Sequence, residues 1–273
     1  MNNKQILPSP CFVCEESLLE ANLQLLEHIQ NETGVKILLA LKGFAMHSTF
    51  DICKKYLKGC CASGLNEAIL AYEEFGSEVH TYSPAFKDNE FDKIAQISNH
   101  IVFNSHAQYD TFKDRLLSNN SVGLRINPQF SSVEVDLYNP CGINSRLGIV
   151  KNNFKAYSID NIDGLHFHAL CEQNVDALEG VLNKFIQNFG EYFKDLKWVN
   201  FGGGHHITRA DYDVKRLIEV LKDFKEKYPH LDVYMEPGEA IGWQTGYLES
   251  TVLDIVENDM QIAIRYKCRS TYA

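Results

Sequence analysis

The sequence predicts an α/β fold in which eight parallel strands close into a (β/α)8 TIM barrel. Two observations indicate this fold: eight short apolar segments recur along the chain, and helical stretches occupy the intervals between them. Strands that alternate with helices form parallel sheets, and eight such units favour a closed barrel, with an open doubly wound sheet as the alternative. The predicted strands are Lys36–Leu39, Cys60–Ser63, Val79–Tyr82, His100–Phe103, Val122–Ile126, Gly164–His168, Trp198–Phe201 and Asp232–Met235.

The helical period is clearest after the sixth and seventh predicted strands. Apolar residues recur there three and four positions apart, a spacing that places them on one face of a helix. The first stripe consists of Val175, Leu178, Val181, Leu182, Phe185, Ile186 and Phe189, and the second of Val214, Leu217, Ile218, Leu221 and Phe224.

The chain divides into three predicted parts. Residues 1–33 form an N-terminal extension, whose helix over Glu16–Gln30 packs on the barrel, and residues 34–246 form the barrel itself. Residues 247–273 begin a C-terminal β-domain, because two further segments with strand character are followed by a polar tail without alternation.

The composition disfavours several classes of protein. With 273 residues, 45% of them hydrophobic, the chain can bury the core of one large domain. Its net charge of −10 argues against a nucleic-acid partner, and no apolar run reaches the ~18 residues of a membrane span. No apolar signal core follows Met1, so we expect a cytoplasmic protein. The pair Cys11 and Cys14 lacks a second CxxC, and we predict no metal site.

Lys42 is the first residue with chemical interest. It follows the apolar run Val35–Leu41 and precedes Gly43. At the end of a buried strand, we expect burial to favour its neutral amine, which is a nucleophile. The alternative is an ordinary lysine that extends from a strand end into solvent.

Three later features favour the first interpretation. His166 and His168 lie on one face of a strand, Gly202–Gly204 follow the next strand, and Glu236 precedes a Pro-Gly turn. With Lys42 they fall at the carboxyl ends of strands, where barrel enzymes carry their active sites. Glycines let backbone amides approach a phosphate, so an amine, an imidazole, a phosphate cradle and a carboxylate together indicate a pyridoxal phosphate (PLP) enzyme.

Each of these features also has a structural explanation. The glycines can form a tight turn, His168 can be a core residue, and Glu236 can be a surface turn acid. The histidines of the two strand ends could also bind a metal together with Glu236, as in barrel hydrolases. That alternative set is His166, His168, His205, His206 and Glu236.

These segments resemble the fold type III PLP-dependent decarboxylases, the group that includes alanine racemase, diaminopimelate decarboxylase and eukaryotic ornithine decarboxylase. Within it they look most like carboxynorspermidine (carboxyspermidine) decarboxylases. The matching segments are Ala40–Gly43, Cys61–Glu67, Arg125–Pro128, Ser145–Gly148, Gly164–His168, Phe201–His205 and Glu236–Glu239.

The resemblance implies roles for individual residues. Lys42 would bind PLP covalently, His168 would stack on the pyridine ring, and Glu236 would pair with its nitrogen. The other implied cofactor contacts are Gly202, Gly203 and Gly204 at the phosphate, and Arg146 and Glu67 near the cofactor.

The resemblance also implies a substrate. Many relatives have Arg after the Pro-Gly turn, whereas this chain has Glu239, as carboxynorspermidine decarboxylases do. We expect Glu239 or Glu172 to bind the cationic end of a polyamine. The implied reaction is decarboxylation of carboxynorspermidine or carboxyspermidine to norspermidine or spermidine, in polyamine biosynthesis. The alternatives are another fold type III amino-acid decarboxylase, of diaminopimelate or ornithine type, and a non-catalytic PLP-binding barrel.

The C-terminal residues depart from the family pattern. Family members are homodimers whose C-terminal β-domain supplies a proton-donating cysteine to the partner's active site. Here the predicted strands Leu248–Val256 and Met260–Ile264, with a turn at Asn258 and Asp259, start that domain, and Cys268 lies in a polar tail without a glycine-rich loop. We expect a truncated or frame-shifted chain with impaired activity, or one half of a split protein.

Overall fold

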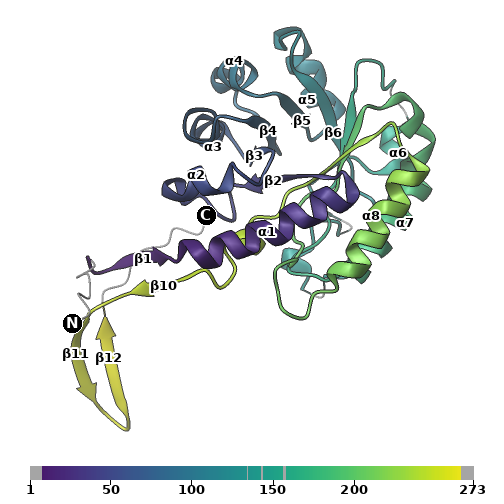
Figure 1. Cartoon of the computed structure of the whole chain (residues 1–273). Coiled ribbons are helices and arrows are strands. Elements are labelled where there is room, and N and C mark those ends of the chain that lie inside the picture. The colour runs from purple at the N-terminus through teal and green to yellow at the C-terminus, as the bar shows by residue number, and fades with distance from the viewer. Residues whose placement is uncertain (1–7, 134, 143, 156–157, 266–273) are drawn as a thin grey trace.

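Eight parallel strands form a closed barrel, which confirms the predicted fold and excludes the open sheet (Figure 1). The computed structural model describes residues 8–133, 135–142, 144–155 and 158–265. The barrel strands are β2 (Lys36–Ala40), β3 (Gly59–Ala62), β4 (Glu78–Ser83), β5 (His100–Phe103), β6 (Ser121–Arg125), β7 (Gly164–His166), β8 (Trp198–Asn200) and β9 (Asp232–Met235).

The barrel closes between its first and last strands. Lys36 of β2 lies opposite Tyr234 of β9, and Ile37 lies opposite Met235. Each remaining strand pairs in parallel with its neighbour in the sequence, so all eight carboxyl ends meet at one rim.

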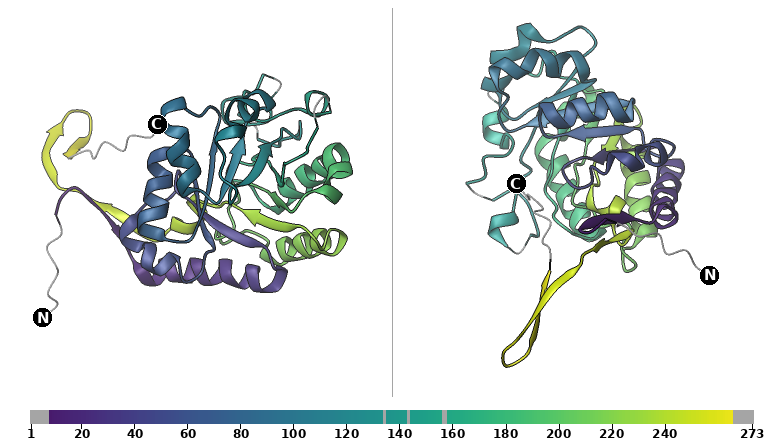
Figure 2. Two further views of the ribbon diagram at one scale, coloured as in Figure 1. Left: turned by 90° about the horizontal axis from the view of Figure 1, so that it is seen from above. Right: turned by 90° about the vertical axis from the view of Figure 1, so that its left-hand side faces the viewer.

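Helices surround the barrel (Figure 2). The N-terminal helix α1 ends at Gly34, whose left-handed backbone (φ 70°) lets its N–H donate to the carbonyl of Gln30. The helices are α1 (Glu16–Thr33), α2 (Phe50–Cys53), α3 (Leu65–Leu70), α4 (Asp88–Ile97), α5 (His106–Phe112), α6 (Lys151–Phe154), α7 (Val175–Phe189), α8 (Val214–Lys227) and α9 (Glu239–Gly242), with a π-helical turn at Ala71–Phe75 and 3₁₀ turns at His47–Thr49, Lys113–Arg115, Asp136–Tyr138 and Gly190–Asp195. None of them, over the described ranges, is long and apolar enough to span a membrane.

Two small sheets lie outside the barrel. The strand β1 (Cys11–Cys14), which the sequence analysis did not predict, pairs antiparallel with β10 (Gly246–Glu249). The predicted single strand Leu248–Val256 was wrong: β10 ends at Glu249, and a new strand starts at Val252. The break lets β10 pair with β1, while β11 (Val252–Glu257) and β12 (Gln261–Arg265) form a separate hairpin that projects from the barrel (Figure 1).

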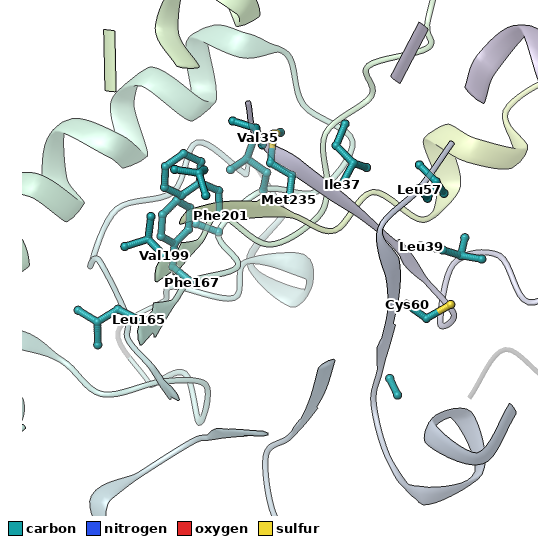
Figure 3. Packing of buried hydrophobic residues seen from close by; sticks show 14 of the residues in the cluster. Val35, Ile37, Leu39, Leu57, Cys60, Leu165, Phe167, Val199, Phe201 and Met235 are labelled. Atoms are coloured by element: carbon teal, nitrogen blue, oxygen red, sulfur yellow. The ribbon is translucent and has the colours of Figure 1, made fainter. Parts of the chain in front are cut away.

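The main hydrophobic core lies between the barrel and its helices. Side chains that point outward from the strands, such as Leu39, Phe167 and Phe201, are fully buried there (Figure 3). A second cluster inside the barrel consists of Leu38, Val102, Trp198 and Tyr234. It fills the interior below the carboxyl-end rim and leaves that rim to polar side chains.

Candidate active site

A cavity of about 1190 Å³ opens at the carboxyl ends of the barrel strands. Lys42, His168 and Glu236 all line it, as do Glu67 and Arg146. The rim therefore brings together five of the ten predicted site residues, although they come from five separate segments of the chain, one of them helix α3.

Lys42 reaches the cavity from the turn that follows β2. This turn packs against the loop after β9: a Cβ on Gly43 would lie 2.9 Å from the backbone nitrogen of Glu239. The N–H of Ala40 donates to the carbonyl of Pro237 at 3.1 Å, so the two loops hold each other in place. The predicted burial of Lys42 was wrong, because its side chain is exposed to the open cavity.

Glu236 is an ionised carboxylate in a largely buried position. Its side chain is 13% exposed, its Oε1 accepts a hydrogen bond from Asn200 Nδ2 at 2.7 Å, and its Oε2 lies 3.5 Å from His166 Nε2. Burial alone would raise its pKa, but His166, His80 and Asn200 outweigh burial and lower the pKa to about 2. The group can therefore offer a negative charge at any physiological pH.

His168 presents a neutral imidazole to the same cavity. Burial lowers its pKa well below the usual value, and the charges of Arg125 and Lys42 lower it further. The N–H of Gly203 donates to its Nδ1 at 3.1 Å, so the ring proton belongs on Nε2. This hydrogen bond fixes the ring at the end of β7, in a position suited to stacking on a flat ligand.

The glycine loop after β8 is wedged between the ends of β7 and β9. A Cβ on Gly202 would lie 2.3 Å from the carbonyl oxygen of Phe167, and one on Gly203 would lie 2.4 Å from that of Glu236. Gly204 also has a left-handed backbone (φ 84°), and its Cβ would lie 2.1 Å from the carbonyl oxygen of Leu170. Close packing thus accounts for all three glycines, and their contact with a phosphate stays a prediction.

Glu67 and Arg146 are each held by a hydrogen bond, Glu67 on helix α3 through its side chain and Arg146 in a loop through its carbonyl. The carboxylate of Glu67 accepts a hydrogen bond from the N–H of Ser63 at 2.7 Å. The carbonyl of Arg146 accepts one from Asn104 Nδ2 at 2.9 Å, and its side chain is exposed. Over the described residues neither side chain forms an ion pair, so the Arg146 guanidinium and the second carboxylate oxygen of Glu67 are available to a ligand in the cavity.

Glu172 and Glu239 lie beside the cavity and not in its wall. Glu172 is exposed, with φ at 52°, and the half-exposed Glu239 accepts a hydrogen bond from His206 at 3.1 Å. The thiol of Cys171, which does line the cavity, has its pKa raised first by burial and then by these two charges. Both acids therefore act electrostatically on the cavity, and substrate binding by either one stays a prediction.

Arg125 is a site residue that the sequence analysis missed. Its side chain is buried, its guanidinium lies 4.6 Å from the centre of the Tyr82 ring, and it donates to the carbonyl of His168 at 3.3 Å. It lines the cavity together with Tyr82. The signal was an arginine at the carboxyl end of an otherwise apolar strand, where a buried charge calls for a partner.

The structure gives no support to the metal alternative. In the part of the chain that the structure describes, the group of side chains close enough to share an ion is Glu78, His80 and His100. These residues occupy the opposite end of the barrel. The rings of His80 and His100 also stack in parallel, 3.9 Å apart at 10°, so their in-plane lone pairs do not converge on one point.

Comparison with known proteins adds to this geometry. No family model matches the sequence. A carboxynorspermidine/carboxyspermidine decarboxylase from Campylobacter jejuni is 52% identical over 94% of this chain and 67% of its own length. A carboxyaminopropylagmatine decarboxylase from Synechocystis is 45% identical over 92% of this chain and 65% of its own length. The chain thus spans about two thirds of the relatives it matches.

Solved structures show the same relationship. A carboxynorspermidine decarboxylase from Campylobacter jejuni, complexed with norspermidine, superimposes with a TM-score of 0.88 at 50% identity, over 95% of this chain and 67% of that one. A lysine decarboxylase from Selenomonas ruminantium, solved with PLP and cadaverine, shares the fold at 16% identity and a TM-score of 0.75, over 97% and 73% of the two chains.

The barrel and the residues at its rim define a fold type III decarboxylase barrel. At the identities found, the chain belongs to the family of carboxynorspermidine/carboxyspermidine decarboxylases. This confirms the resemblance stated from the sequence.

Proposed function

We propose that this chain binds PLP at Lys42 and forms the cofactor-binding part of a decarboxylase for carboxynorspermidine and carboxyspermidine. The observation that supports this best is the convergence of Lys42, His168 and Glu236 on one cavity in a member of this family. The products would be norspermidine and spermidine, which places the reaction in polyamine biosynthesis.

The donor set fits PLP. The cavity offers a primary amine for the aldehyde, a neutral imidazole for the ring face, and a buried anion for the ring nitrogen. When bound, PLP supplies an electron sink that accepts the electron pair released as CO₂ leaves. Glu236 would keep the ring nitrogen protonated, and His168 would stack on the face of the ring. Arg146 and the amide of Gly204 would meet the phosphate, because the amides of Gly202 and Gly203 already donate to Asn200 and His168.

The chain's own charges favour a cationic substrate. Glu172 and Glu239 place negative charge beside the cavity, and among the described residues His206 is the one basic side chain that pairs with either of them. Ammonium groups of a polyamine would be attracted to this side of the rim. A second candidate is carboxyaminopropylagmatine, because the Synechocystis relative that acts on it is 45% identical.

We further propose that the working enzyme is a homodimer. The hairpin β11–β12 leaves apolar side chains such as Leu253, Ile255 and Met260 more than half exposed. Such a surface is typical of a contact with another chain or domain. The proton that replaces CO₂ would then come from a residue outside the described cavity.

Borohydride trapping tests the cofactor site. Purified chain is incubated with PLP, reduced, and mapped by peptide mass spectrometry, with Lys42→Arg and the matched surface control Lys151→Arg alongside. We expect one phosphopyridoxyl group on Lys42, lost in Lys42→Arg and kept in Lys151→Arg. Labelling scattered over several lysines would contradict the proposal.

A substrate panel tests the reaction. Release of CO₂ from carboxynorspermidine, carboxyspermidine, carboxyaminopropylagmatine, diaminopimelate and ornithine is compared on the same preparation. We expect the first two to react fastest, and Glu239→Gln to raise their KM more than it lowers kcat. An adduct on Lys42 without any CO₂ release would instead identify a non-catalytic PLP-binding barrel.

A further inference from the structure

The barrel interior contains a histidine that none of the roles above uses. The His166 side chain is 2% exposed, and neither of its ring nitrogens has a hydrogen-bond partner among the described residues. Buried polar groups are nearly always hydrogen-bonded, so an unpartnered imidazole at this depth requires an explanation.

The explanation lies in the neighbouring carboxylate. Glu236 Oε1 is held by Asn200, whose orientation is fixed because its Oδ1 accepts the N–H of Gly202 at 2.8 Å. Glu236 Oε2 faces His166 Nε2 across 3.5 Å, a few tenths of an ångström beyond a hydrogen bond. Cys61 of β3 also faces Glu236, and burial keeps its thiol neutral by raising its pKa. His166 is thus placed to donate to the second carboxylate oxygen.

The surrounding groups favour a neutral His166. Burial opposes its protonation most strongly and lowers its pKa, and Arg125 of β6 and His80 of β4 act in the same direction. The Tyr82 ring packs beside it, 5.5 Å away between ring centres, and adds no negative charge. Only Glu236 favours protonation, so the ring keeps one proton, and Nε2 is the nitrogen that faces an acceptor.

We propose that His166 is a positioning residue for Glu236: its neutral ring donates Nε2–H to Oε2 and directs the remaining lone pairs of the carboxylate toward the ring nitrogen of PLP. This inference rests on the proposed function, because the role exists only if Glu236 meets that nitrogen. A hydrogen bond donated to a carboxylate stabilises its ionised form. His166 and Asn200 together hold Glu236 from two adjacent strands, so that the free lone pairs of its carboxylate point in one fixed direction.

The test reads the protonation of the ring nitrogen directly. PLP labelled with ¹⁵N in the ring is bound to the purified full chain and followed by NMR between pH 6 and 9. Three variants are compared with the native chain: His166→Leu removes the donor, His166→Gln keeps an amide near the Nε2 position, and His106→Leu removes another buried imidazole, on α5. The dissociation constant of PLP is measured on the same samples.

We expect the native chain and His106→Leu to keep the ring nitrogen protonated throughout. In His166→Leu the pKa of that nitrogen should fall by about one unit or more, and PLP should bind about tenfold more weakly. His166→Gln should bring both the pKa of the ring nitrogen and the affinity for PLP most of the way back to the native values, which a purely structural role would not predict.

Several outcomes would overturn the inference. One is a folded His166→Leu chain whose bound PLP titrates as in the native chain. If the leucine variant does not fold, His166→Asn replaces it, because its shorter amide lies near the Nδ1 position; equal titration of the Asn and Gln variants then rejects the role of Nε2. A native chain that forms no adduct at Lys42 rejects the proposed function itself, and this is established by trapping before any NMR.

Discussion

The two ends of the barrel interior differ in how their polar side chains are partnered. At the amino end Lys36 pairs with Asp232 at 2.9 Å and Trp198 donates to Ser121 at 2.8 Å, and one nitrogen each of His80 and His100 is left without a hydrogen bond among the described residues. At the carboxyl end, among the described residues, Lys42 has no hydrogen-bond or ion-pair partner, and neither nitrogen of His166 forms a hydrogen bond, although Nε2 lies 3.5 Å from Glu236.

The difference indicates that polar groups at the amino end stabilise the fold and that those at the carboxyl end are available to a ligand. A polar group whose hydrogen bonds are made within the fold contributes to stability, whereas an unpartnered group that lines a cavity can still bind a ligand. The amino end is closed by packing, since a Cβ on Gly164 would lie 2.1 Å from the Trp198 ring. The carboxyl end keeps a cavity of about 1190 Å³.

The largest effect should follow from neutralising the buried anion at the carboxyl end. We expect Glu236→Gln to lower the decarboxylation rate by about 10²–10³-fold, because a fixed charge at the cofactor is lost. The melting temperature should stay within a few degrees of native, since Gln keeps the shape and the partner Asn200. Steady-state kinetics and thermal melts on the same samples check this. Unchanged kinetics would remove Glu236 from the site.

Substituting a crowded glycine should destabilise the fold at either end of the barrel. Gly164→Ala forces a Cβ against Trp198, and Gly204→Ala forces one against the carbonyl of Leu170 at a left-handed backbone. We expect each to destabilise the fold by about 1–3 kcal/mol or more, because neither neighbour can move freely. Gly64→Ala is the matched control, since nothing lies within 4 Å of its Cβ and its backbone is extended. Urea unfolding measures all three, and equal stabilities would contradict the packing argument.

The barrel itself could be predicted because each of its strands is a short apolar segment that can be recognised from the local sequence. The predicted strand His100–Phe103 coincides with β5, and Lys36–Leu39 differs from β2 by one residue. In contrast, β1 was missed because it is short and pairs with β10, which lies more than two hundred residues later in the chain. A strand defined mainly by a distant partner leaves little local pattern to recognise.

The sequence predicted the position of half of the candidate site residues, but not their surroundings. Strand ends and a family resemblance placed Lys42 and Glu236 at one rim, and the cavity confirms that they meet there. The exposure of Lys42 could not be predicted, because it depends on how wide the cavity opens. The contact of Arg125 with Tyr82 joins two strands through the barrel interior, and only the closed geometry shows it.

The pH dependence of stability should report the buried histidines of the barrel. Burial lowers the pKa of His100 to about 2 in the folded chain, against an ordinary value of 6.5. Below pH 6.5 the unfolded chain takes up a proton that the folded chain resists, so stability falls as the pH falls toward 2, by about 1.4 kcal/mol per pH unit for one such group. His205, with a pKa of about 4, acts in the same direction over a shorter range.

Removing one of these groups should flatten that slope. Denaturant unfolding between pH 7 and 5 is compared for the native chain, His100→Phe, and the exposed control His47→Phe. We expect a shallower slope in His100→Phe and a native slope in the control. Parallel lines for all three would show that the buried imidazole takes up its proton as readily when folded as when unfolded.

The smallest effect should come from the ion pair between Lys36 and Asp232 at the amino end. Lys36 and Asp232 are 30% and 53% exposed, so solvent screens their attraction, and Asp232→Asn should cost less than about 1 kcal/mol. That cost should vanish in about 1 M salt, where charges are screened over a few ångströms. Because Lys36 also donates to the hydroxyl of Tyr234 at 3.3 Å, the lysine stays anchored when the carboxylate is lost. A loss of several kcal/mol, unaffected by salt, would mean that the amino end depends on charge as the carboxyl end does, and the contrast between the two ends would fail.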